Sequence, residues 1–282
     1  MVITDILADS GQIVGNVTMT QSSRSLNAAV IWNNGTPALL QSPGPQYPQT
    51  FANSINDAGE VAGFAELASG TGAPVVWNGL TPTVLGMASG CTGDSIASGI
   101  NNNGLVVGFM QCGANVPVDE AVVWHGTTPT VLPEVKSQHA PGGKALAANN
   151  FGLVVGTANN PSSYAYATAW KGTVVTNLGV LGTGIRSTAT AVNDQGIIVG
   201  ESSTEGEGPP FHASLWSRVG AETQDLNALI SAAEAKEILL TEAVGINNSC
   251  AIVANGYYRK NLTVEVAFLL TLIDASSCVN GM

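Results

Sequence analysis

Charged residues, and basic ones above all, are scarce in this chain. Lysine and arginine together number 9 against 20 aspartates and glutamates, which gives a formal net charge of −11. Nucleic acids and anionic membrane surfaces are bound chiefly through lysine and arginine. We therefore expect no nucleic-acid partner and no membrane partner.

Long apolar runs are missing too. A membrane-spanning helix needs roughly 20 consecutive apolar residues, and no stretch of the sequence approaches that length. Met1 runs directly into the first expected strand, without the charged and apolar regions that make up a signal peptide. We expect neither a transmembrane helix nor a signal peptide within this chain.

The short motifs of common enzymes are absent as well. The sequence has no Gly-x-Ser-x-Gly elbow, no phosphate-binding glycine loop, no His-Glu-x-x-His and no Cys-x-x-Cys. The alternating Asp-x-Asp-x-Asp spacing of calcium loops is missing. We expect no cofactor and no metal.

Cysteines are few, but their positions are informative. Cys91 and Cys112 flank one expected hairpin at its open end, while Cys250 lies in a turn and Cys278 in the C-terminal tail. We predict disulfides between Cys91 and Cys112 and between Cys250 and Cys278, as an oxidising compartment would produce. The alternative is four free thiols in a cytosolic protein.

What the sequence has in abundance is one repeated stretch. Residues 100–108 read Ile-Asn-Asn-Asn-Gly-Leu-Val-Val-Gly, and recognisable copies occupy residues 7–15, 55–63, 148–156, 192–200 and, degraded, 246–254. Asn and Asp open turns through side-chain to backbone hydrogen bonds, and the glycine after them takes a positive φ. Each copy therefore predicts a β-hairpin.

A second signature follows each hairpin and sets the period. Five copies end in Trp32, Trp77, Trp124, Trp170 and Trp216, so the intervals are 45, 47, 46 and 46 residues. The sixth copy ends in leucine, as Ala-Phe-Leu-Leu at residues 267–270. A Thr-Pro-Thr-Val type strand mostly comes next, which makes four strands per repeat.

This pattern predicts an all-β fold, a six-bladed β-propeller with four antiparallel strands per blade. We expect it to form a single domain over residues 1–282, with repeats at approximately 3–50, 51–95, 96–144, 145–188, 189–242 and 243–275. Tryptophan at the end of an apolar strand favours packing between blades. The alternative is a ring of sugar-stacking platforms.

One segment departs from the repeat. Between Leu226 and Leu239 the sequence turns to helix formers with apolar residues near helical spacing. We predict one short helix there, inserted between blades five and six and capped by Asp225 or Asn227.

The combination Ile-Asn-x-x-Gly-x-Val-Val-Gly, then Ala-x-x-Trp-x-x-Gly, then Leu-Gly-x-Leu-Gly at residues 178–182 resembles the HAF repeats of extracellular bacterial proteins. The closing segment, from Asp225-Leu226-Asn227 to residues 267–270, is similar to the final repeat of that family. The resemblance covers almost the whole chain. It implies a secreted β-propeller, extracellular or periplasmic, and supplies no catalytic residues.

Functional residues are expected on the variable loops. The turns joining strands one to two and three to four are short and uniform, whereas the other loops, at the opposite end of each blade, differ in every repeat. Function on a rigid scaffold usually lies on variable loops. The candidate acid-base groups there are His139, His212, Glu120 and Glu201, and the candidate substrate-binding residues are Arg186, Tyr166, Tyr164 and Tyr258.

Two functions stay open at this point. One is a secreted, monomeric binding or interaction module that recognises a small-molecule, glycan or protein ligand. The other is a cofactor-independent lyase, hydrolase or cyclase with its pocket at the mouth of the central channel. A propeller hosts both, so the fold does not choose between them.

Overall fold

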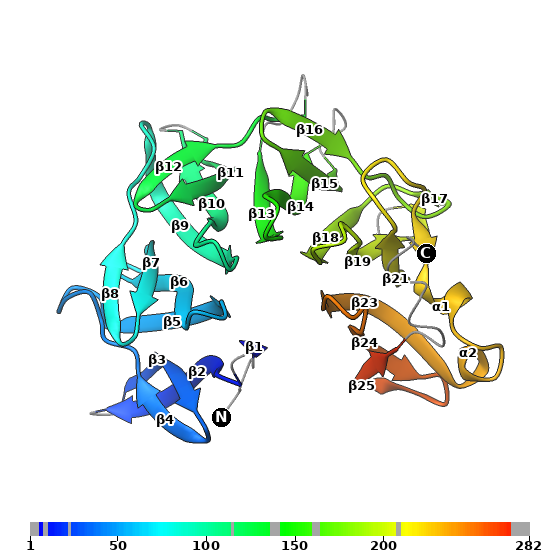
Figure 1. Ribbon diagram of the computed structural model, residues 1–282, viewed down its shortest axis with the longest axis horizontal. Coiled ribbons are helices and arrows are strands. Elements are labelled where there is room, and N and C mark those ends of the chain that lie inside the picture. The colour runs from blue at the N-terminus through cyan, green and yellow to red at the C-terminus, as the bar shows by residue number, and fades with distance from the viewer. Residues whose placement is uncertain are drawn as a thin grey trace. The chain divides into compact units, whose positions relative to one another are not determined.

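The computed structural model describes residues 6–7, 11–21, 24–113, 116–135, 142–159, 164–206 and 210–271. The chain divides into two compact units, residues 1–132 and 133–282. Each unit carries three of the six repeats as separate antiparallel sheets (Figure 1). The sheets are the blades of an all-β, six-bladed β-propeller, as predicted. The single domain stays a prediction.

In the first unit the strands follow the order one-two-three-four in each blade. Their bounds are β1 (Ile6–Leu7), β2 (Ile13–Gln21), β3 (Arg24–Asn33) and β4 (Thr36–Leu39); β5 (Gln49–Ile55), β6 (Glu60–Glu66), β7 (Gly72–Asn78) and β8 (Thr81–Val84); and β9 (Cys91–Ile100), β10 (Val106–Cys112), β11 (Val118–His125) and β12 (Thr128–Val131).

The second unit repeats this arrangement and adds a small parallel pair, β17 with β20. The bounds are β13 (Gly143–Ala148), β14 (Leu153–Asn159), β15 (Ala165–Lys171) and β16 (Val174–Asn177); β17 (Thr183–Gly184), β18 (Ser187–Val192), β19 (Ile198–Ser203), β20 (Glu205–Gly206), β21 (Phe211–Trp216) and β22 (Gln224–Asp225); α1 (Leu226–Leu229) and α2 (Glu234–Glu237); and β23 (Ile238–Ile246), β24 (Ile252–Tyr258) and β25 (Asn261–Leu270).

Two details of the prediction are wrong. Blade six pairs three strands within the described residues, β23, β24 and β25, where four were expected. The single predicted helix is two one-turn helices, α1 and α2. They are separated because Ile230 is extended. Just before α2, the Ser231 N–H donates to the Glu234 carboxylate and the Glu234 N–H donates to the Ser231 Oγ. The cap of α1 is confirmed, since the Asp225 carboxylate accepts from the Asn227 N–H at 2.8 Å.

The disulfide between Cys91 and Cys112 is confirmed, and it joins directly opposed residues of β9 and β10. The predicted partner of Cys250, Cys278, lies outside the described residues, so that second bond stays a prediction. Cys250 itself is buried and takes the left-handed φ of 57° that glycines take in the equivalent turns.

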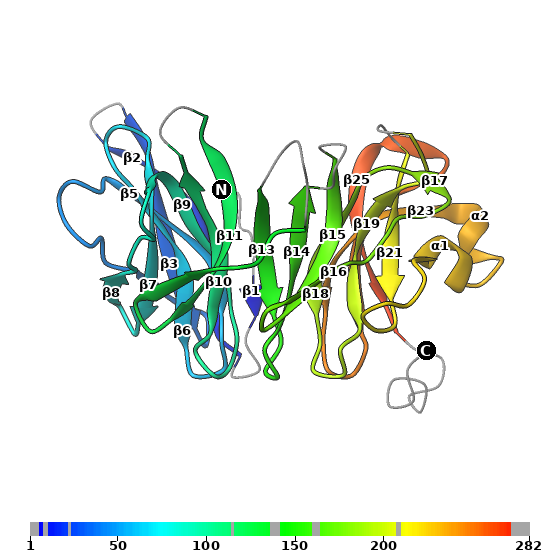
Figure 2. The same ribbon diagram turned by 90° about the horizontal axis from the view of Figure 1, so that it is seen from above.

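The repeated asparagine has two functions. In blade three the Asn101 Oδ1 accepts from the backbone N–H groups of Asn103 and Leu105, which closes the predicted turn. The amide nitrogen then reaches the next blade: the Asn56 Nδ2 donates to the Asn101 carbonyl at 3.1 Å, and the Asn149 Nδ2 to the Asn193 carbonyl at 3.0 Å. Within each unit these turns lie at one end of the sheets (Figure 2). The asparagine therefore joins neighbouring blades.

The tryptophans join the same neighbours through apolar contact and a further hydrogen bond. Trp77, Trp124, Trp170 and Trp216 are fully buried. In Trp77, Trp124 and Trp216 the indole N–H donates to a carbonyl in the segment that follows the fourth strand of the preceding blade of the same unit, for example Trp124 to Gly86 at 2.9 Å and Trp216 to Leu178 at 2.8 Å. The Trp170 N–H donates to the Pro133 carbonyl at the start of its own unit, at 2.9 Å. Packing between blades is thus confirmed for Trp77, Trp124 and Trp216.

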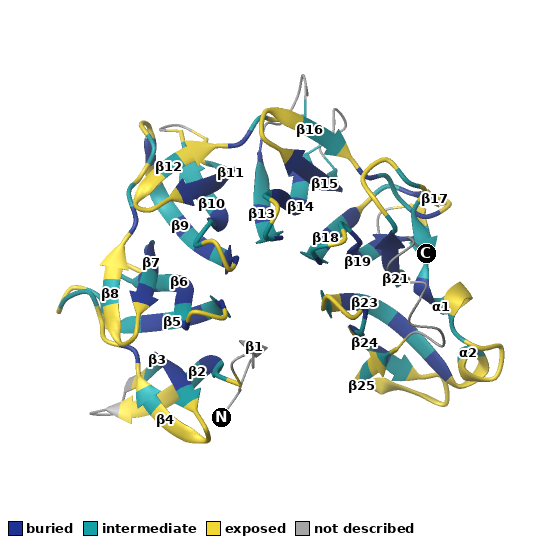
Figure 3. Cartoon of the chain, in the orientation of Figure 1, coloured by how far each residue is buried: buried dark blue, intermediate teal, exposed yellow. Residues whose placement is uncertain are grey.

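Trp32 is the exception, because it is only half-buried. It lies on β3, in the first blade of the first unit. The burial pattern in Figure 3 is otherwise regular: the strands β10 and β11 are mostly buried, whereas the short fourth strand β12 is mostly exposed.

Candidate functional site

The variable-loop end of blades four and five brings two predicted residues together. Tyr164 lies just before β15 in blade four, and Arg186 just before β18 in blade five. The Arg186 guanidinium lies over the Tyr164 ring, with its carbon 6.0 Å from the ring centroid. Arg186 is exposed and forms no ion pair within the described ranges. We call these two residues the Arg-Tyr pair.

The backbone beneath Arg186 is held by two buried serines. The Ser203 Oγ accepts from the N–H groups of Ile185 and Arg186, at 3.0 and 3.1 Å, and the Ser203 N–H donates to the Arg186 carbonyl at 2.9 Å. Ser202 donates to the same carbonyl at 3.3 Å. Both serines are fully buried. Arg186 is therefore anchored at its backbone while its side chain reaches solvent.

The parallel pair of β17 with β20 fixes the loops around Arg186. Thr183 pairs with Glu205 and Gly184 with Gly206. Gly184 cannot carry a side chain, because a Cβ there would lie 1.9 Å from the Ser203 carbonyl oxygen. The close approach of these two loops thus depends on glycine and on the serine hydrogen bonds.

His212 lies near the same end of blade five and forms a hydrogen bond with Asp225. The His212 Nδ1 is 2.6 Å from the Asp225 Oδ2, and the two side chains are 21% and 26% exposed. Burial raises the pKa of Asp225, but the hydrogen bonds from His212 and Asn227 outweigh it and lower the pKa below its ordinary value. Asp225 therefore remains a carboxylate and orients the imidazole.

Glu201 faces a second carboxylate across the interface of blades five and six. Burial raises the pKa of Glu201, and the negative charge of Glu242 raises it further. The pKa of Glu242 is raised as well, by burial first and by Glu265 to a smaller extent. Two half-buried carboxylates therefore repel each other here.

This repulsion makes a pH-dependent prediction for Glu201→Gln. Below the ordinary pKa of glutamate the Glu201 carboxyl is protonated in both the folded and unfolded states, so its raised pKa does not lower the free energy of unfolding. As the pH rises through the raised folded pKa, the folded state must ionise a group that its surroundings disfavour, and stability is lost. We expect Glu201→Gln to stabilise the protein by about 0.5–1 kcal/mol at pH 7 and to have no effect near pH 3. Urea unfolding at the two pH values measures this, and equal shifts at both would contradict it.

The other predicted residues are dispersed. Tyr166 and Tyr258 are on β15 and β24, and Tyr258 packs edge-on against Phe268 with Lys260 over its ring. Glu120 is half-buried on β11, in the first unit. His139 lies outside the described residues, so its predicted approach to His212 stays a prediction.

Sequence reasoning missed Asp225 and Glu242 as members of this region. Asp225 was predicted only as a helix cap, although it lies on β22, the strand that pairs with the His212 strand β21. Within the described ranges, no three His, Cys, Asp or Glu side chains gather in a group that could hold a metal ion. No helix in the described part of the chain is long and apolar enough to cross a membrane.

Comparison with known proteins adds little beyond the fold. No family model matches the chain, and no curated protein matches it. The resemblance to HAF-repeat proteins therefore stays a prediction. Among solved structures the chain is similar to the β-propeller domain of the Trilobed protease from Pyrococcus furiosus, described as having an open velcro topology. The identity is 10%, the match covers 99% of each chain, and the TM-score is 0.46.

Proposed function

We propose that the protein is a secreted, monomeric binding module whose ligand site is the Arg-Tyr pair at the variable-loop end of blades four and five. The observation that carries the proposal is the exposed guanidinium of Arg186 over the Tyr164 ring, 6.0 Å from its centroid. Two residues from different blades meet there on a backbone that buried serines hold in place. A binding group held in position loses little conformational freedom when it binds.

The chemistry of the pair suggests the class of ligand. An exposed arginine without an acidic partner favours a carboxylate, which it binds with two parallel hydrogen bonds. The half-buried ring of Tyr164 offers an aromatic face of the kind on which sugars stack. We therefore propose an anionic glycan, such as a polyuronate, as the ligand.

Secretion forms part of the same proposal. The disulfide between Cys91 and Cys112 is typical of proteins that fold in an oxidising compartment. The expected extracellular or periplasmic location is supported by this bond and by the resemblance to extracellular repeat proteins.

Binding of polygalacturonate and of dextran to the immobilised protein tests the proposal. We expect polygalacturonate to bind and neutral dextran not to bind. Arg186→Met should weaken polygalacturonate binding at least tenfold, and Tyr164→Ala several-fold. Arg218→Met, which removes another exposed arginine in the same blade, is the matched control and should leave binding unchanged. Equal losses in both arginine variants would show that only net charge matters.

The pairing of His212 with Asp225 favours a second function, a lyase, hydrolase or cyclase that uses His212 as acid or base. A carboxylate on Nδ1 fixes the tautomer so that Nε2 can exchange a proton with a substrate. The experiment is to incubate the bound glycan with the protein and follow its chain length. Turnover that His212→Ala abolishes, with binding retained, would favour the enzyme. An unchanged chain length would favour the binding module.

A further inference from the structure

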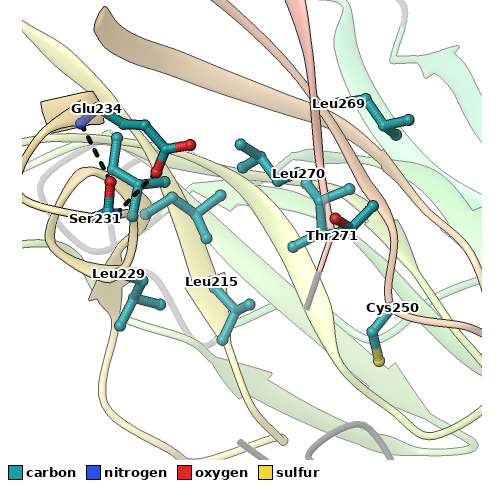
Figure 4. A pocket seen from close by; sticks show the side chains of 11 residues that line it. Leu215, Leu229, Ser231, Glu234, Cys250, Leu269, Leu270 and Thr271 are labelled. Atoms are coloured by element: carbon teal, nitrogen blue, oxygen red, sulfur yellow. Dashed lines mark hydrogen bonds between the residues drawn. The ribbon is translucent and has the colours of Figure 1, made fainter. Parts of the chain in front are cut away.

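A mostly apolar cavity of about 460 Å³ lies between blades five and six of the second unit. Its walls come from β21, β24 and β25 and from the two inserted helices. Leu229, Ser231 and Glu234 line one side, and Leu269, Leu270 and Thr271 the other (Figure 4). Cys250 also lies in the wall, and the polar side chains are few. Two of them, Ser231 and Glu234, each accept a hydrogen bond from the other's backbone N–H.

The position of the cavity in the repeat explains its origin. In blade five Trp216 is opposed by Ile198 on the second strand, and in blade six Leu270 is opposed by Ile252 in the same way. Leu270 thus stands where the four earlier blades of this pattern carry a buried tryptophan. Blade six therefore lacks the indole ring that fills this position in those blades.

The walls around the two positions correspond residue by residue. Trp216 packs with Ala169, Ile198 and Leu178 in one apolar cluster. Each of these three residues has an equivalent in the cavity wall. Leu215 corresponds to Ala169, since each directly precedes the tryptophan of its strand, and Ile252 corresponds to Ile198, since each lies opposite the tryptophan position. Leu226 corresponds to Leu178, since each directly follows the fourth strand of its blade. The three positions that surround the Trp216 indole therefore have equivalents around Leu270, where they line an open cavity. We call it the indole slot.

The backbone carbonyl that accepts from the indole N–H in blade five has a different donor in blade six. The Leu178 carbonyl accepts from the Trp216 indole N–H at 2.8 Å. Its equivalent, the Leu226 carbonyl, accepts instead from the Ile230 N–H at 3.3 Å and ends helix α1. The inserted helix thus satisfies the carbonyl that the missing tryptophan would otherwise leave unpaired, and the slot can stand open.

From these observations we infer that the indole slot is a binding site for a neutral planar aromatic molecule of one or two fused rings. Its size falls within the range of small-molecule pockets, which are mostly apolar and largely preformed. The identity of the ligand is argued from the other blades, whose equivalent positions enclose an aromatic ring. This site is separate from the Arg-Tyr pair and does not depend on the proposed function.

Indole itself is the probe, titrated against the full chain in a calorimeter. We expect one indole per chain, with a Kd on the order of 0.1 mM for a ligand of this size. Leu270→Trp should abolish binding and raise the thermal midpoint, because its own side chain fills the slot. Leu262→Trp adds a tryptophan at the other, exposed end of the same strand, and is the matched control that should bind as the parent does.

Leu229→Asp provides a second variant that leaves the buried core intact, because Leu229 is 52% exposed. It places a charge on the cavity wall and should weaken indole binding at least tenfold. Binding that survives both Leu270→Trp and Leu229→Asp would overturn the inference. So would a full chain that takes up no indole up to the solubility limit.

Discussion

Replacing Trp124 by alanine is expected to lower the free energy of unfolding by about 3–5 kcal/mol. The indole is fully buried against blade two, and its N–H donates to the Gly86 carbonyl. The substitution therefore creates a cavity and leaves a buried carbonyl without its donor. Urea unfolding at pH 7 measures the change.

Trp32→Ala is the matched control for this prediction. It removes the same side chain from the same place in the repeat, but Trp32 is only half-buried. We expect a loss of about 1 kcal/mol. Equal losses for the two variants would contradict the role assigned to packing between blades.

Gly108→Ala is expected to destabilise the protein by about 3 kcal/mol or more, as overpacking against rigid backbone does. A Cβ at this position would lie 2.0 Å from the Ile96 carbonyl oxygen, on the adjacent strand of the same blade. The pairing of β9 with β10 shifts register at this glycine, and the shift brings the carbonyl against it. Neither strand can move without breaking the sheet.

Gly245→Ala gives the comparison for a glycine within a strand. No atom lies within 4 Å of the Cβ that would be added there, so we expect a change within about 0.5 kcal/mol. Thermal unfolding of both alanine variants, followed by circular dichroism, decides the matter. A Gly108→Ala variant as stable as Gly245→Ala would show that the last glycine of the repeat is not required by close packing.

The repeat predicted the hairpins because their causes are local. The asparagine of each turn bonds to backbone only two and four residues away, and the glycine after it needs a positive φ. Because these contacts join residues close together in the sequence, the sequence alone predicts them. The amide of the same asparagine bonds to the next blade, about a whole repeat away, and that partner becomes visible only when the sheets are placed.

The candidate site shows the same division. Arg186 and Tyr164 were both predicted as binding residues, but nothing in the sequence places one over the other, since they precede strands of different blades. Asp225 was missed as the partner of His212, because their contact depends on the pairing of β21 with β22. The indole slot had a visible signal, the leucine at the sixth tryptophan position, and only its walls required the structure.

The central claim is that the repeated residues join neighbouring blades, while the departures from the repeat supply the sites. Hydrogen exchange of the five tryptophan indole N–H groups, followed by NMR in heavy water, tests it without any substitution. Three of these groups, in Trp77, Trp124 and Trp216, donate to carbonyls in the segment after a neighbouring blade of the same unit, and Trp170 donates to Pro133 at the start of its unit. We predict that these four exchange slowly and that Trp32 exchanges rapidly. Five indoles that exchange at the same rapid rate would contradict the account.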